Sequence, residues 1–385
     1  MSTLKVGAIR GVSASSDAIT VANDGTCNAN LTSVGGGPLG NRNMLINGAM
    51  QINQRGSGSL TVNSSTGQFP CDRWVARGEG GSKAYTIQQV SIASSGQGVR
   101  NAIKVTSSQA ASVSSSDIFN VRQMVEGFNI QRMNFGESGC KSMTLSFTVR
   151  SSVAGTHSGA IQNSAQNRSY PFTYTLSADT WTDISVTIPP ITDGSSWNET
   201  NGVGARVVFD MGSGDNFRGA AGQWNSAQDE GATGAVRILE TNGATWEVTK
   251  VELQVGSVAT DFEHRSYAEE LTLCQRYYYR LQPAVSAYFG SGFFYNSNSF
   301  ICHIDFPVIM RANVTALEQT GTADHYKVIH NATTSTCSSV PTFLGDPNNT
   351  SQSVAFNFSG SGTQGQGGLG RSGNASAFLG FSAEL

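Results

Sequence analysis

The stretch SYAEELTLCQRYYYRL, residues 266–281, divides the sequence in two, because it is the clearest helix pattern among many short strand-like runs. Ser266 and Glu269 match a capping box, in which each side chain satisfies a backbone N–H at the start of a helix. Apolar side chains follow at spacings of four and three residues and would lie along one stripe: Tyr267, Leu271, Cys274, Tyr278 and Leu281. A helix of this length is marginal in water unless its stripe is buried. The stripe therefore predicts docking on a neighbouring domain or, as we favour, a helical collar between identical chains.

The composition of the 385 residues favours an all-β protein. Charged residues make up only 13%, where about 25% is typical, and 44 residues are glycine. This mixture suits sheets joined by glycine-rich turns better than helices with charged surfaces. The net charge of -3 and the lack of a Lys/Arg cluster argue against nucleic acid as a partner. Because no signal-peptide pattern and no apolar run of about 18 residues occur, we expect a soluble protein without membrane insertion.

Period-2 alternation predicts strands on both sides of the helix. Residues 143–150 alternate apolar and polar side chains, and residues 300–306 do the same before Pro307. Further strands are predicted at residues 181–188, 205–211 and 326–330. Residues 118–128 carry helical spacing, although Gly127 favours a strand there, and residues 359–373 are interpreted as a flexible glycine-rich loop.

We therefore predict four segments. They are a small polar arm and linker (1–38), with a turn at Asn23-Asp24-Gly25, a large β domain (39–265), the helix (266–281) and a smaller β-sandwich (282–385). The smaller unit has few residues for a free-standing sandwich, and its open strand edges favour association between chains.

Catalytic and metal-binding patterns are weak. The sequence has no motif of a serine hydrolase, a zinc protease or a P-loop, and we predict no enzyme, no cofactor and no metal site. Gly365, Gly367 and Gly370 match G-x-G-x-x-G, but no hydrophobic strand leads in, so a dinucleotide site is rejected. His157 is assigned to a loop, and the six cysteines are expected to be reduced and mostly in the core.

The text NRNMLINGAMQINQRG (41–56), CDRW (71–74) and WEVTKVELQVGSVATDFEHRSYAEELTLCQRYYYR (246–280) resembles the jelly-roll module of tail-fibre proteins of tailed bacteriophages. Such modules are similar in form to carbohydrate-binding modules. The resemblance covers roughly residues 41–281, and it implies a homotrimer with a C-terminal tip.

It further implies a location on the virion after synthesis in the host cytoplasm, and an arm that binds a tail or adaptor protein. The tip would bind a polysaccharide or lipopolysaccharide of the host surface. The alternatives are a structural tail component without primary receptor binding and a polysaccharide-degrading tailspike.

Sugar binding requires an aromatic face together with amide or hydroxyl groups. Trp74, Trp181 and Trp246 lie in strand-like text and are assigned to the core. Two sets are candidates for carbohydrate contacts, one in loops of the large domain and one in the tip: Trp197 and Trp224, and Phe293, Phe294, Tyr295 and Asn296, with Asn298 nearby.

Related jelly rolls often hold calcium near the first strand. Here Asn47-Gly48 is followed by Ala49-Met50-Gln51, and Lys250 stands in the closing strand where an acid would favour the ion. We therefore predict no tightly bound calcium at that position.

Overall fold

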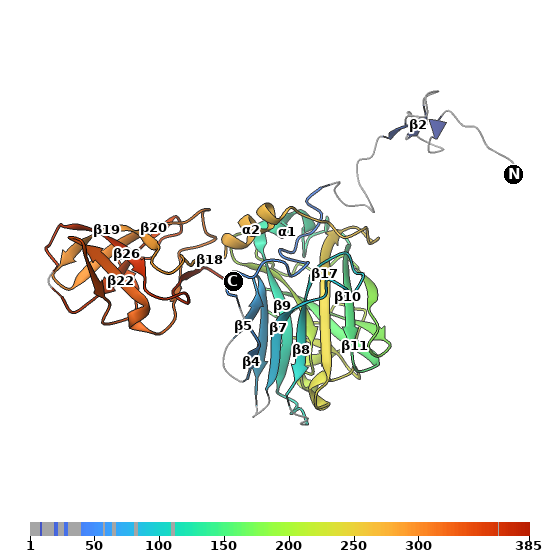
Figure 1. Ribbon diagram of the computed structural model, residues 1–385. Coiled ribbons are helices and arrows are strands. Elements are labelled where there is room, and N and C mark those ends of the chain that lie inside the picture. Colours follow the sequence, from blue (N-terminus) through green and yellow to red (C-terminus); the bar gives the residue numbers. More distant parts are fainter. Residues whose placement is uncertain are drawn as a thin grey trace.

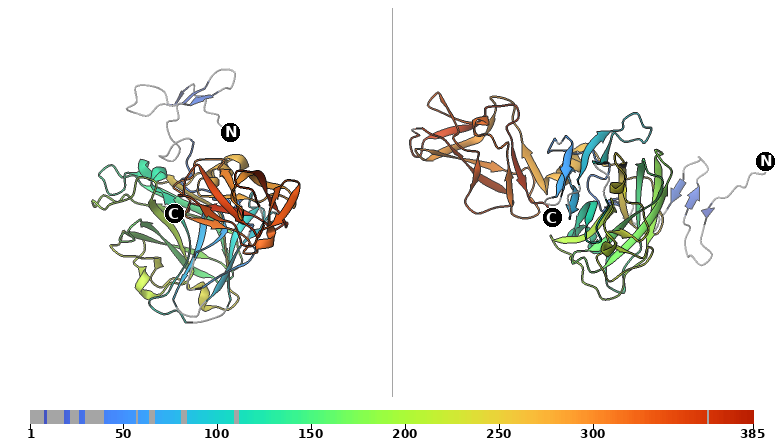
Figure 2. Two further views of the ribbon diagram at one scale, coloured as in Figure 1. Left: turned by 90° about the vertical axis from the view of Figure 1, so that its left-hand side faces the viewer. Right: turned by 90° about the horizontal axis from the view of Figure 1, so that it is seen from below.

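The computed structural model describes residues 8–9, 19–21, 27–29, 40–56, 58–63, 67–80, 84–108, 112–360 and 362–385. Within this part of the chain the fold is all-β, with a large sandwich followed by a smaller β unit, the tip, that projects from its side (Figure 1). The right-hand view of Figure 2 shows the same arrangement from below. No helix among the described residues is long and apolar enough to cross a membrane.

The large sandwich consists of two antiparallel sheets, each with six described strands. Sheet 1 has the order β13 (Thr182–Ile188), β10 (Met143–Ser151), β17 (Thr245–Val255), β8 (Asn101–Ser107), β7 (Tyr85–Ser91) and β4 (Leu60–Val62). Sheet 2 has the order β12 (Ser169–Leu176), β11 (Gly155–Asn163), β14 (Val203–Asp210), β9 (Ile118–Glu126), β6 (Trp74–Glu79) and β5 (Gln68–Cys71). This two-sheet arrangement is the jelly-roll sandwich that the sequence predicted.

Alternating side chains of the two sheets meet in one core. Met143, Leu145 and Phe147 of β10 are buried, as their period-2 pattern predicted. Trp74 and Trp246 are fully buried. Trp181 is only partly buried and lies under the guanidinium of Arg150, 5.0 Å from the ring centroid, so its assignment to the core is wrong.

Two further sequence assignments are settled by β9 and β11. Residues 118–126 form a strand, as Gly127 favoured, and the helical spacing continues only into the short α1 (Gly127–Ile130) and η1 (Gln131–Met133). His157 lies on β11 and not in a loop. Its ring is buried and stacks on Tyr174 at 5.6 Å, which the neighbouring glycines concealed.

A long excursion between β14 and β17 covers part of the outer face of sheet 2. It contains η2 (Asp215–Phe217), β15 (Arg218–Gly219), β16 (Gly231–Ala232) and η3 (Ile238–Glu240). Arg218 and Asp210 form a buried ion pair of 2.6 Å beneath it. Because both groups are desolvated, removing one partner would leave an uncompensated buried charge.

The boundary helix is shorter than predicted. α2 spans Tyr267–Gln275, and its start is confirmed, because the Ser266 Oγ accepts a hydrogen bond of 3.2 Å from the Glu269 N–H. The following residues form β18 (Tyr278–Leu281), which pairs with β27 (Leu379–Ser382) near the end of the chain. Aromatic residues favour strands, and the pairing with β27 places Tyr278 and Tyr279 in a strand and not in the predicted helix.

The predicted stripe is consequently not one helical seam. Cys274 and Tyr278 are fully buried within the chain, whereas Tyr267 is 56% exposed. Leu271 and Leu281 are partly buried, on α2 and β18 respectively. Docking within the chain therefore accounts for much of this stripe, and a collar built on a helix of residues 266–281 is corrected.

The tip consists of two sheets. The larger has seven described strands in the order β23 (Thr333–Thr336), β22 (Tyr326–His330), β26 (Gly367–Ser372), β19 (Tyr288–Asn296), β20 (Ser299–Asp305), β25 (Ser351–Asn357) and β24 (Thr342–Leu344). The smaller joins β18, β27 and β21 (Ala316–Glu318), and η4 (Ala323–His325) leads into β22. The second, smaller sandwich is thus present.

The second half of the glycine-rich stretch near the end, residues 367–372, is a central strand of this sheet and not a flexible loop. Gly367 and Gly370 lie on β26, between β22 and β19. A Cβ on Gly370 would lie 3.3 Å from the ring of Phe356, and one on Gly368 would lie 3.0 Å from the ring of Phe300. Glycine is required here because the aromatic core packs directly against the strand.

The end of the chain ties the tip to the sandwich. Glu384 forms ion pairs with Arg55 and Arg73 of the sandwich, and Leu385 packs against a small apolar cluster that includes Ile46 and Ile52. Across the same junction, Arg276 binds the buried Glu126 at 2.6 Å. These contacts join the two units.

Of the predicted arm, the structure describes β1 (Ala8–Ile9), β2 (Ile19–Val21) and β3 (Cys27–Ala29), which form a three-stranded antiparallel sheet. The predicted turn at Asn23-Asp24-Gly25 and the linker lie outside the described residues. The five cysteines whose side chains are described are free thiols, and four of them are buried.

Candidate functional site

The two loop tryptophans of the sandwich pack against each other and against its core. Trp197 is only 8% exposed and stacks on Phe135 with ring centroids 4.2 Å apart. The rings of Trp197 and Trp224 form a T-shaped pair with centroids 5.9 Å apart. Their indole N–H groups donate to the Ser195 hydroxyl and the Pro189 carbonyl. Trp197 therefore closes the end of its own domain, and its assignment as a ligand platform is wrong. Trp224 is partly exposed and stays a candidate.

The predicted aromatic group of the tip is divided by the alternation of β19. Phe294 is fully buried, with its ring 5.4 Å from that of Phe358, so it cannot contact a ligand and is removed from the candidates. Phe293 and Tyr295 point away from the core and are 49% and 58% exposed. The hairpin between β19 and β20 therefore presents two aromatic side chains to the outside.

The same hairpin borders an open hollow of about 740 Å³. Asn296 lines it together with residues of the hairpin, of the approach to β24 and of the segment after β25: Ser297, Asn298, Ser299, Ser338, Asn357, Phe358, Ser359 and Gly360. None of these described lining residues has an ionisable side chain. Amide and hydroxyl groups, with exposed aromatic rings on the same hairpin, suit a neutral, polyhydroxylated ligand.

The hairpin is held in place by backbone hydrogen bonds. The Asn298 N–H donates to the Asn296 side-chain carbonyl at 2.9 Å, and the Asn298 carbonyl accepts from Phe358 N at 3.0 Å. Ser299 pairs with Asn357 across β20 and β25. A ligand in this hollow would therefore meet groups that are already positioned, which reduces the entropy cost of binding.

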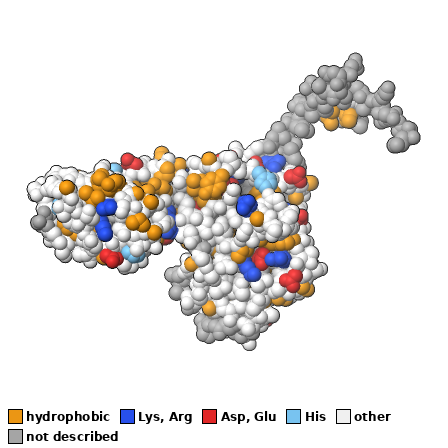
Figure 3. All heavy atoms as spheres, viewed as in Figure 1, with side chains coloured by type: hydrophobic (Ala, Val, Ile, Leu, Met, Phe, Trp, Pro, Cys, Tyr) orange, Lys and Arg blue, Asp and Glu red, His pale blue; other side chains and the backbone are white. Residues whose placement is uncertain are grey.

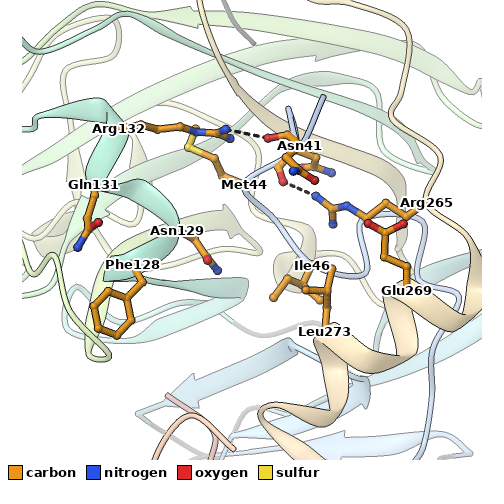
Figure 4. A pocket seen from close by; sticks show the side chains of 11 residues that line it. Asn41, Met44, Ile46, Phe128, Asn129, Gln131, Arg132, Arg265, Glu269 and Leu273 are labelled. Carbon is orange, nitrogen blue, oxygen red and sulfur yellow. Dashed lines mark hydrogen bonds between the residues drawn. The ribbon is translucent and has the colours of Figure 1, made fainter. Parts of the chain in front are cut away.

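A second hollow of about 420 Å³ lies in the sandwich between α1 and α2 (Figure 4). Phe128, which is 51% exposed, and Asn129 line one side, and Glu269 and Leu273 of α2 line the other. Arg132 lies at the upper edge, where it donates to the Asn41 carbonyl at 2.8 Å. The arginine N–H groups that line this hollow already donate hydrogen bonds to backbone carbonyls, so fewer of them remain for a ligand.

The acids near the first strand are paired with arginines. Glu252 of β17 lies 3.8 Å from the guanidinium of Arg42 and accepts a hydrogen bond from Glu263 N. Burial raises the pKa of Glu252, and it raises the pKa of Glu270, which contacts Arg265. Among the described residues, no group of three or more His, Cys, Asp or Glu side chains is placed to hold a metal ion. The low affinity for calcium stays a prediction.

No known protein family and no curated protein matches the sequence. Solved structures that are similar include the enzymatically active domain of tailspike protein 4 of bacteriophage CBA120, with 10% identity and a TM-score of 0.30 over 55% of this chain and 21% of that one. A family 11 carbohydrate-binding module of Clostridium thermocellum, in complex with a mixed-linked tetrasaccharide, is 12% identical with a TM-score of 0.27 over 53% and 98%.

The N-terminal cellulose-binding domain of a Cellulomonas fimi glucanase is 15% identical, with a TM-score of 0.22 over 51% of this chain and 97% of that one. The chain thus spans about a fifth of the tailspike structure, and these similarities leave its family open.

Of the residues that line the hollow, the sequence analysis singled out Asn296 and Asn298 but not Ser338 and Asn357. The missed residues lie roughly 40 and 60 positions further along the chain, and only the pairing of β20 with β25 brings Asn357 to the hairpin. No local pattern in the sequence signals that pairing.

Proposed function

We propose that this chain is a non-catalytic fibre protein of the bacteriophage tail-fibre type, which is attached through its N-terminal arm and binds a neutral host-surface glycan at its tip. The observation that carries the proposal is the hollow at the β19–β20 hairpin with its uncharged lining, together with the exposed rings of Phe293 and Tyr295 on the same hairpin. Sugar rings stack their apolar face on aromatic side chains, while amides bind their hydroxyl groups.

The absence of catalysis is part of the proposal. Glycoside hydrolysis uses two carboxyl groups flanking the scissile bond, and the described lining of the hollow offers none. Two deeply buried acids of the sandwich are engaged with cations. Glu126 accepts from Arg276 and from the Tyr277 hydroxyl, and Asp210 accepts from Arg218.

The homotrimer belongs to the same proposal. Hydrophobic side chains gather over the tip and continue toward the join on the face in Figure 3. Tyr267, Tyr288 and Ile309 are among the exposed large hydrophobic residues, at 56%, 49% and 63%. Such exposure is typical of surfaces that meet other chains. Three tips on one fibre would convert weak single-site affinity into lasting attachment.

The experiment uses the full chain and a glycan array that contains neutral and acidic host polysaccharides. Tyr295→Ala should weaken binding to the neutral glycan by about tenfold, because the stacking surface is lost. Phe128→Ala is the control, since Phe128 is an aromatic residue of similar exposure, 51%, but lies on α1 of the sandwich and not on the tip.

If Tyr295→Ala leaves binding and host-cell adsorption unchanged, the tip is not the receptor site. A structural tail component would then be the better interpretation. Release of reducing sugar by the wild-type chain would contradict the non-catalytic part of the proposal.

A further inference from the structure

Three arginines form a diagonal across the outer face of sheet 2. Arg122 of β9 lies opposite Val75 of β6 and Val208 of β14. On β6, Arg77 lies two residues from Val75. On β14, Arg206 lies two residues from Val208, and it is displaced from Arg122 along the strands in the direction opposite to Arg77. Because side chains two apart on a strand share a face, the three guanidinium groups occupy neighbouring positions on adjacent strands. We call these three residues the arginine diagonal.

Only part of this positive charge is neutralised. Glu230, in the excursion that covers sheet 2, has a fully buried side chain and lies 3.7 Å from Arg77. Its carboxylate also accepts a hydrogen bond of 2.8 Å from the side-chain amide of Asn120. Glu79 pairs with Arg77 at the exposed end of the diagonal. Three guanidinium groups therefore face two carboxylates, and neither carboxylate forms a hydrogen bond with Arg122 or Arg206.

The surplus charge is only partly satisfied by hydrogen bonds, since the Arg206 Nη1 donates to the carbonyls of Asn163 and Ser164 at 2.7 and 2.8 Å. Arg122 and Arg206 are both partly buried, and the Nε of each is buried without a hydrogen-bond partner among the described residues. Burial, together with the neighbouring guanidinium of Arg122, lowers the pKa of Arg206 to about 10. Burial and the charge of Arg77 likewise lower the pKa of Arg122. An added anion would reduce this repulsion, so the cluster is matched to a negative ligand.

We propose that the arginine diagonal binds a carboxylate-bearing sugar, such as a uronic acid unit of an acidic polysaccharide. A guanidinium presents two parallel N–H groups that match the two oxygens of a carboxylate, which makes this pairing both strong and directional. The partly exposed amides of Gln166 and Gln228 lie beside the diagonal, where they donate to Gln162, opposite Arg206, and to Glu230, and such amides suit the hydroxyl groups of a sugar ring.

This site is independent of the proposed function. It lies on the large sandwich, it selects an acidic ligand, and it needs neither the tip nor the trimer. It gives the chain a second glycan specificity, so that an acidic and a neutral polymer would be bound by different parts of one molecule.

The test is isothermal titration calorimetry of the full chain with a short oligogalacturonate at low ionic strength. The wild type should bind, and Arg122→Gln should bind about tenfold more weakly, because a charged hydrogen-bond partner is lost. Arg100→Gln removes the same charge from an exposed loop position of the sandwich and should leave binding unchanged. The melting temperature of each variant establishes that it is folded.

Arg122→Lys is a second test, since this variant keeps the positive charge but loses the planar guanidinium with its parallel N–H groups. It should bind with intermediate affinity. A wild type that does not bind oligogalacturonate, or an Arg122→Gln variant that binds like the wild type, would overturn the proposal. So would inorganic phosphate, or the neutral methyl ester of the same oligosaccharide, binding as tightly as the acid.

Discussion

The two surfaces proposed to bind glycans differ in charge, although they belong to one chain with few charged residues. The hollow at the tip is lined by amides, hydroxyls and a buried ring, with no ionisable side chain among its described residues. The outer face of sheet 2 concentrates three arginines around a buried glutamate. The composition averages over both. The low content of charged residues, 13%, therefore does not reveal the arginines that gather on the sandwich.

The first prediction separates the folding of the two units. In Gly292→Ala the added Cβ would lie 1.8 Å from the Ile301 carbonyl oxygen, so β19 and β20 could not pair. We expect the tip to lose more than about 4 kcal/mol of stability while the sandwich stays folded. Calorimetry of thermal unfolding checks this. Gly367→Ala on the neighbouring strand is the control, because its nearest atom would be 3.9 Å away.

The second prediction distinguishes a packing tryptophan from a binding one. Trp197→Ala should cost about 3–5 kcal/mol of stability, because a buried ring stacked on Phe135 is removed. It should leave both glycan affinities unchanged. Trp181→Ala, at a partly buried position, should cost much less. A loss of affinity in Trp197→Ala at unchanged stability would restore Trp197 as a ligand platform.

The third prediction concerns pH and places its effect at the junction, away from both binding surfaces. Burial raises the pKa of Asp72 to about 6, with Arg55 and the hydrogen bonds from Gln54 opposing the shift and Glu384 adding to it. The folded state therefore holds a proton that the unfolded chain releases at lower pH, and stability falls as pH rises from about 4 to 7. The shift corresponds to about 3 kcal/mol.

Chemical denaturation at several pH values measures this slope. Asp72→Asn should flatten it, because the titrating group is removed. An equally steep slope in that variant would assign the pH dependence to another group.

The fourth prediction uses salt to sharpen the comparison. Binding of an acidic glycan to the arginine diagonal should weaken by about three- to tenfold when ionic strength rises from about 0.05 to about 0.5 M, because salt screens partly exposed charges. Binding of a neutral glycan at the tip should change by less than about twofold. Equal salt dependence at the two sites would remove the distinction between them.

Local patterns predicted most of the framework and failed where distant residues decide. The alternation in residues 143–150 became β10, and Ser266 caps α2 as predicted. The helix was predicted to reach Leu281, but pairing with the last strand of the chain turns Tyr278–Leu281 into β18. The stripe of apolar residues could not reveal a partner about 100 residues away.

Glycine-rich sequence was the other source of wrong predictions. Within residues 359–373, which were interpreted as a loop, residues 367–372 form the central strand β26, where glycine allows aromatic rings to pack against the backbone. The loops around Trp197 were interpreted correctly as loops, yet their rings point into the domain. The arginine diagonal had no sequence signal, because its members lie about 40 and 80 positions apart and meet only through the register of sheet 2.

The most direct measurement is binding of the full chain to two immobilised polysaccharides, one neutral and one rich in uronic acid, compared between Tyr295→Ala and Arg122→Gln. We predict that Tyr295→Ala loses most of its affinity for the neutral polymer and keeps that for the acidic one, and that Arg122→Gln shows the reverse. If both variants lose both affinities, or if neither loses any, the assignment of two separate surfaces to two kinds of glycan is contradicted.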